Sequence, residues 1–292
     1  LRAPTVVEQF ARELQEFRID EKPDSIAMCA ELVGKSAFFD HAMAVHIQSS
    51  ALSGFLCSIV ENMVSGRSND STQQEQGETV RLLAGASGVE SAVMLEELDK
   101  LIDRIAAHPD AQQRFQQASI ADALAWLSGA PDIAPAYAAF LRTNGHRGYR
   151  ELCMRDPAWR DEPAPLIQSM QAAVHARLVT GGHAPLQTHT IDWPSLSRGL
   201  RWVLPKAHDA IRRREQTKSQ LVEVAHRFKR GFYHLGQLLQ SQGALPDADL
   251  VNFFSVAELP EFVAAPSAEA VANAVARREA LAYQQRFEFP EI

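Results

Sequence analysis

Apolar residues recur every three or four positions along most of the chain, and the clearest run extends from Ala207 to Leu239. The apolar members of this run are Ala207, Ala210, Ile211, Leu221, Ala225, Phe228, Phe232, Leu235 and Leu239. This spacing predicts a helix with one core-facing stripe. Two cations fall on the stripe: at about 100° per residue, Arg214 lies in line with Phe232, and Lys218 is turned only about 40° away. We therefore expect both side chains to face inward.

The same periodicity predicts helices over most of the remaining sequence. Asp24 and Ser36 are candidate N-caps, and each precedes helical spacing, so two helices are expected at the start of the chain. Further helical patterns occupy 90–105, 120–127, 137–141, 167–178 and 267–285. These patterns predict a mainly α, multi-helix fold.

Two segments depart from the helical pattern. Residues 65–77 contain no large apolar side chain and several turn formers, which predicts a mobile surface loop. Residues 250–256 are short and aromatic, so at most a short β element is expected there. We interpret 1–292 as a single helical region with possible sub-lobes 1–130 and 131–292.

Length and composition indicate a soluble cytoplasmic protein. The chain has 292 residues and is 46% hydrophobic, which allows a substantial core. We find no run of about eighteen uninterrupted apolar residues and no signal-peptide pattern, so we expect no membrane partner. The three cysteines lack CxxC spacing and the histidines are scattered, so no metal site is predicted.

Charge is distributed unevenly. The formal net charge is −7, yet residues 198–230 hold ten Lys or Arg against three acids. A local basic region in an acidic protein favours a small anion over a nucleic acid. Arg214 and Lys218, one turn apart with Cβ atoms about 6 Å from each other, would suit a phosphoryl group.

An alternative explains the same two charges without a ligand. Cations on an apolar stripe are commonly paired with carboxylates of neighbouring helices, or extend to solvent at the rim of the stripe. If Arg214 and Lys218 point to solvent, or are already neutralised, the enzymatic interpretation loses its physical basis.

A second polar cluster spans 144–151. Its glycines, Gly145 and Gly148, bracket His146 and Arg147 and permit tight turns with close approach of other groups. The pair supplies a cation and a proton carrier, or else forms a structural corner. Three apolar residues of the first helices are candidates for an acceptor pocket, with ordinary core as the alternative: Phe39, Met43 and Phe55.

Four segments in order resemble the central helical region of phosphoenolpyruvate-synthase-like phosphotransferases, particularly the rifampicin phosphotransferase branch. They are Leu83–Ala92, Gly145–Glu151 with Trp159–Pro163, the Arg214-Glu215 and Lys218 signature, and Gly243–Leu259. Departures occur at Tyr149-Arg150 and at Thr217-Lys218-Ser219, where the family pattern is "PKF".

The resemblance implies a division of labour. In this family an ATP-grasp domain uses ATP and Mg, a swivelling domain carries the phosphoryl group on a histidine, and the helical region holds a small-molecule hydroxyl acceptor. Arg214 and Lys218 would steady the phosphoryl group, and Glu215 would accept or orient the proton of the acceptor. His146, Arg147 and Glu151 are the matching acceptor-binding candidates.

Only the helical region is matched by this resemblance, so we expect no cofactor in this segment and no activity of the segment alone. The competing hypothesis is a non-enzymatic helical binding or scaffold module in which the charged clusters are structural ion pairs.

Overall fold

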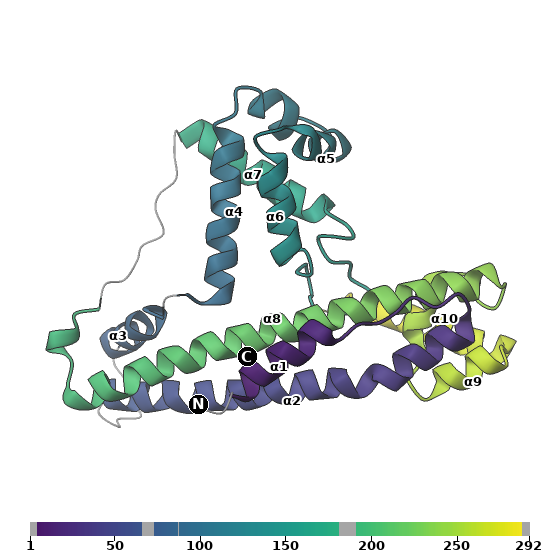
Figure 1. Cartoon of the computed structure of the whole chain (residues 1–292), viewed down its shortest axis with the longest axis horizontal. Helices are drawn as coiled ribbons and strands as arrows, with labels where there is room; N and C mark the ends of the chain where they lie inside the picture. Colours follow the sequence, from purple (N-terminus) through teal and green to yellow (C-terminus); the bar gives the residue numbers. More distant parts are fainter. Residues whose placement is uncertain (1–4, 66–72, 87, 181–190, 288–292) are drawn as a thin grey trace.

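A computed structural model describes residues 5–65, 73–86, 88–180 and 191–287, and these residues form a mainly α fold (Figure 1). The predicted fold class is confirmed. The helices are α1 (Val6–Glu16), α2 (Ser25–Val64), α3 (Gln73–Ala84), α4 (Glu90–Ala106), α5 (Ile120–Gly129), α6 (Ala134–Asn144), α7 (Ala164–Thr180), α8 (Arg198–Ser241), α9 (Glu258–Ala264) and α10 (Ala268–Gln284). Three short elements complete the list: a π-helix, η1 (Gln112–Gln116), and two 3-10 helices, η2 (Trp193–Ser195) and η3 (Ala248–Phe253).

The two helices expected near the start of the chain, after Asp24 and after Ser36, form one continuous helix, α2. The carboxylate of Asp24 accepts a hydrogen bond from the Ala27 amide at 2.8 Å and caps α2 as predicted. Ser36 does not begin a new helix, because its hydroxyl instead donates to the carbonyl oxygen of Val33. The expected break at Ser36 is therefore wrong.

At most a short β element is expected near 250–256, and the described residues there contain none, because Ala248–Phe253 forms η3. Asp247 caps this turn by accepting from the Asp249 amide, and the apolar residues Leu250, Val251 and Phe253 are buried. Within the expected loop 65–77, residues 66–72 lie outside the described residues, whereas 73–77 belong to α3.

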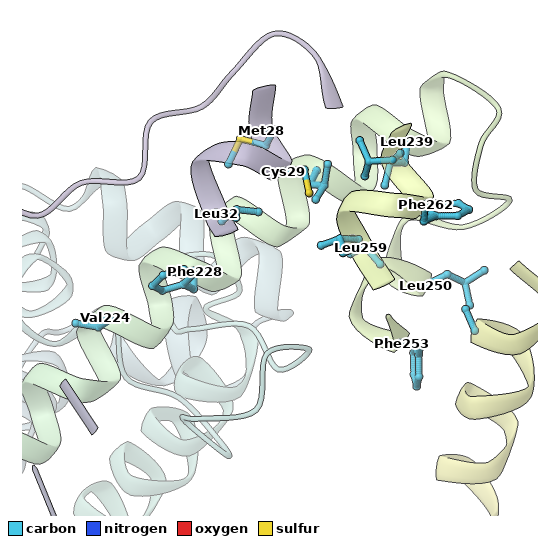
Figure 2. Packing of buried hydrophobic residues seen from close by; sticks show 14 of the residues in the cluster. Met28, Cys29, Leu32, Val224, Phe228, Leu239, Leu250, Phe253, Leu259 and Phe262 are labelled. Carbon is cyan, nitrogen blue, oxygen red and sulfur yellow. The ribbon is translucent and has the colours of Figure 1, made fainter. Parts of the chain in front are cut away.

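Helices α2 and α8 run antiparallel for most of the length of the molecule and make the most extensive contact between any two elements (Figure 1). At one end, the apolar residues of both helices form a core together with α1, η3, α9 and α10 (Figure 2). Its members include Met28, Leu32, Phe228, Leu239, Leu250 and Phe262. At the other end, Val60 packs with Leu82 and Leu204 in a smaller core.

Helices α4 to α7 stand on the middle of α8 with a core of their own (Figure 1). This core includes Ile105, Phe115, Leu127, Ile133 and Ile167. The segment 145–163 connects α6 to α7 and lies against α8. The middle of α8 is therefore the place where helices α4 to α7 meet the α2–α8 pair.

Helix α2 has the length and composition of a membrane-spanning segment. Helices that pack along the core of a soluble protein can have the same properties, and α2 packs along α8.

Gly236 marks a close contact between α8 and η3. A Cβ atom at this position would overlap the carbonyl oxygen of Ala248, which belongs to the backbone and cannot rotate away. By contrast, Gly34 in α2 has open space around it.

We expect Gly236→Ala to lower the free energy of unfolding by about 1–3 kcal/mol, as overpacking does. The matched control Gly34→Ala should raise it by about 0.5–1 kcal/mol, because alanine is the better helix former. Urea unfolding of both variants measures the difference. An equal increase in the free energy of unfolding of the two variants would contradict the close contact between α8 and η3.

Candidate functional site

The contact between α2 and α8 becomes polar at its centre, between the two apolar cores. From α2, the Nδ1 atom of His46 lies 3.2 Å from the Thr217 hydroxyl of α8. Ser53 and Thr217 are both buried there. The predicted catalytic residues Arg214, Glu215 and Lys218 lie in this polar section of α8.

The expectation that Arg214 is buried is wrong. Its side chain is 46% exposed, and its Nη1 atom pairs with Oε1 of Glu215 at 2.7 Å. Arg214 is near enough to Cys57 of α2 to oppose the rise in pKa that burial causes in that thiol. Its long side chain nevertheless extends to solvent.

Lys218 is half-buried, and it forms no ion pair with any residue that the structure describes. Burial lowers the pKa of His46, and the charges of Arg214 and Lys218 lower it further. Both cations therefore lie along the same edge of the α2–α8 contact. Glu215, beside them, is only 14% exposed.

The loop after α6 folds back on itself and on the end of α6 because its glycines permit close contacts. A Cβ atom on Gly145 would overlap the carbonyl oxygen of Leu141. A Cβ atom on Gly148 would come too close to the carbonyl oxygen of Pro157. The loop is held by two backbone hydrogen bonds, from the Trp159 amide to the Arg147 carbonyl at 2.8 Å and from Arg160 to Gly145 at 2.9 Å.

His146 is the residue of this loop that contacts α8 directly. Its Nδ1 atom lies 3.3 Å from Oε2 of Glu223, and its Nε2 atom lies 3.4 Å from the Ser219 hydroxyl. Burial lowers the pKa of His146 to about 4, although the Glu223 carboxylate opposes the shift. The imidazole is therefore neutral near pH 7.

Arg147 is one of two cations that the described residues bury, the other being Lys229. The Arg147 side chain is 8% exposed, and Nε pairs with Oε1 of Glu151 at 3.1 Å. Its Nη1 atom is buried without a hydrogen-bond partner. A buried guanidinium with a free N–H is costly, so this group is able to donate to an oxygen atom of a ligand or of water.

Glu90, at the first turn of α4, is a member of the site that the sequence analysis missed. Glu90 is exposed on the protein surface, yet the surroundings of its carboxyl group raise the pKa of Glu90 by partial desolvation. The Ser219 hydroxyl and Arg147 oppose this shift, and Glu215 adds to it. Only its place in the family-like segment 83–92 could have pointed to it.

The proposed apolar acceptor pocket is not assembled. Phe39 packs edge-on against Phe228 at 5.8 Å between ring centroids, and Met43 packs against the same core. Phe55 is 64% exposed on the far side of α2 from that core. An acceptor-binding role for these three residues stays a prediction.

Two cavities bear on where a ligand could enter. One of about 340 Å³ lies between α1, the start of α4 and α8, and Glu90 and Gln216 are among its lining residues. A larger one, of about 790 Å³, lies beside η1 and α5 next to His108 and Trp126. Only the smaller cavity touches the polar centre of α8.

Comparison with known protein families gives a match that includes this region. A family model described as the rifampicin phosphotransferase fourth domain matches residues 43–215, which is more than half of the chain. The matched range includes His146, Arg147 and Glu151, and it ends at Glu215. No curated protein matches the chain.

The buried imidazole of His146 makes stability depend on pH. The ordinary pKa of 6.5 applies in the unfolded chain, whereas folding lowers it to about 4. Between these values a proton binds the unfolded state more readily, so stability is lost as the pH falls through this window.

Compared with His146→Gln, the wild-type chain should therefore lose about 3 kcal/mol more between pH 7 and pH 4. Urea unfolding at several pH values measures this difference, and the other titrating groups are common to both proteins. Parallel stability curves would contradict a buried neutral His146.

Proposed function

The chain belongs to the family of the rifampicin phosphotransferase fourth domain, and we propose that it is the acceptor-binding helical region of an ATP-dependent phosphotransferase. The observation that carries this proposal is that one family model covers the 144–151 loop and ends within the charged centre of α8, and that His146 of this loop contacts the next turns of α8 at Ser219 and Glu223. In this reaction ATP, water and an acceptor hydroxyl give AMP, phosphate and a phosphorylated product.

The exposure of Arg214 changes how the two cations would act. Arg214 is exposed and already paired with Glu215, so the buried two-cation site expected from the sequence is not formed and does not support the proposal. What remains is that Arg214 and Lys218, at the edge of the α2–α8 contact, would be reachable by a phosphoryl group carried on another domain. Catalysis of phosphoryl transfer consists largely of positioning and of neutralising charge spread over oxygen atoms. One exposed and one half-buried cation meet that requirement without moving the helix.

Glu215 is the group that would take or orient the proton of the acceptor. In the free chain its carboxylate is occupied by Arg214 at 2.7 Å. An incoming phosphoryl group competes for the same guanidinium, and its arrival would release the Glu215 carboxylate for the acceptor hydroxyl. Binding of the donor and activation of the acceptor are then linked through one ion pair.

His146, Arg147 and Glu151 would form the acceptor side of the site. The free N–H of Arg147 donates to an acceptor oxygen, and Glu151 fixes the guanidinium through Nε. The partners are an ATP-grasp domain, which would use ATP and Mg, and a swivelling phosphohistidine domain, on this polypeptide or another in the cytoplasm.

A second candidate function rests on the pairing of charges already present. Arg214 is paired with Glu215, and Arg147 with Glu151, as in a structural network that needs no ligand. In this alternative the chain is a helical binding or scaffold module. The two functions differ in whether the native state binds an oxyanion.

Inorganic phosphate is the probe that separates them. We expect phosphate to raise the melting temperature by several degrees relative to chloride at equal ionic strength, because ligand at one hundred times Kd adds about 2.7 kcal/mol. Lys218→Ala should abolish this rise. The matched control Lys206→Ala removes an exposed lysine of α8 that lies over the Trp202 ring, and it should keep the rise.

An unchanged melting temperature in the wild-type chain, or an equal rise in Lys218→Ala, would favour the scaffold function and reject the phosphoryl-binding role of this edge.

A further inference from the structure

Three side chains that meet at the centre of α8 are arranged like a nucleophile, a base and an orienting acid. Ser219 and Glu223 are four residues apart on α8 and therefore lie one turn from each other on the same face. His146 lies between them, with Nε2 at 3.4 Å from the Ser219 hydroxyl and Nδ1 at 3.3 Å from Oε2 of Glu223. Contacts of this length are typical of such groups before a substrate tightens them.

Glu223 is itself held in place. Its Oε1 atom accepts from Arg227 at 3.0 Å from Nε and 2.9 Å from Nη2, which leaves Oε2 for the imidazole. A carboxylate facing Nδ1 favours the tautomer that carries a proton on Nδ1. The lone pair of Nε2 then points at the Ser219 hydroxyl, as a general base requires.

The surroundings of Ser219 contain groups that suit an ester substrate. Ser219 is 5% exposed, and it lies three residues along α8 from Gln216, which lines the cavity of about 340 Å³ together with Glu90. The free N–H of Arg147, which acts on the same Glu90 carboxyl, is a donor available to a developing oxyanion.

Charge and volume limit the kind of substrate. Three arginines near Ser219 are already paired: Arg147 with Glu151, Arg214 with Glu215 and Arg227 with Glu223. This leaves Lys218 as the cation beside Ser219. Glu90 adds a further carboxyl group, which repels an anionic substrate. The cavity is at the small end of the range for ligand pockets. A small uncharged ester fits both limits.

We propose that Ser219 is a nucleophile activated by His146 and Glu223, and that it gives the chain an esterase activity separate from phosphoryl transfer. The Ser219 oxygen attacks the ester carbonyl carbon while its proton passes to Nε2 of His146. The bond from carbon to the alcohol oxygen breaks, and His146 returns the proton to the departing alcohol. Water then attacks the acyl-serine by the same route, releasing the acid and restoring Ser219.

Diisopropyl fluorophosphate is a suitable probe, because it is small and uncharged and its adduct with an activated serine is stable. The full chain is treated at pH 8 without ATP, and its peptides are analysed by mass spectrometry. We expect an adduct on Ser219 that forms at least about a hundredfold more slowly in His146→Gln, since general-base catalysis contributes about 10²–10⁴. Glu223→Gln, which preserves side-chain size, should also slow labelling.

Ser53→Ala is the matched control, because Ser53 is another buried helical serine and its removal should leave labelling of Ser219 unchanged. Circular dichroism establishes that each variant is folded, and Glu223→Gln keeps the test decisive if His146→Gln does not fold. Hydrolysis of p-nitrophenyl acetate should be lost in Ser219→Ala.

Absence of a Ser219 adduct in the folded wild-type chain would overturn the proposal. So would an adduct that forms equally fast in folded His146→Gln or Glu223→Gln, because Ser219 would then not be activated by this arrangement. None of these results depends on ATP or on a phosphohistidine domain, so they leave the proposed phosphotransferase function to its own test.

Discussion

Burial of the apolar stripe of α8 against α2 is the interaction on which the rest of the structure depends. These two helices supply residues to the cores at both ends of the molecule, and the other elements pack onto the frame that they form (Figure 1). Apolar contact at the ends fixes the register of the pair, because a shift along the helix axis would expose both cores at once. The centre of the pair can therefore carry polar residues without losing its alignment.

The loop that connects α6 to α7 meets α8 at that polar centre. Close packing at Gly145 and Gly148 lets the loop backbone approach, and His146 and Arg147 become buried beside Ser219 and Glu223. Buried polar groups are stable only where they are paired, and most of these are. The free N–H of Arg147 is a departure from full pairing, which makes it a place where a ligand would gain binding energy.

Much of the fold could be predicted from apolar spacing, because a helix of 3.6 residues per turn places its core contacts at regular intervals. The spacing correctly placed α8 and the Asp24 cap of α2. It failed at Ser36, where one hydroxyl bonds to the preceding turn, and at 248–253, where a cap on Asp247 makes a 3-10 helix from residues with strand preference. Local signals alone do not decide such competitions.

The site was only partly predictable for a related reason. Periodicity fixes the angle of Arg214 on the helix but not the depth of its side chain. His146, Arg147 and Glu151 were found because glycines mark their loop. Ser219 and Glu223 lie on α8 and Glu90 on α4, and only the tertiary contact of the loop with α8 brings them together with His146.

The central claim is that the 144–151 loop is energetically coupled to the polar centre of α8. A double-mutant cycle with His146→Ala and Glu223→Ala, measured by urea unfolding near pH 7, tests it most directly. The account predicts a coupling energy of about 1 kcal/mol or more between the two residues. Additive effects of the two substitutions, within about 0.3 kcal/mol, would contradict it.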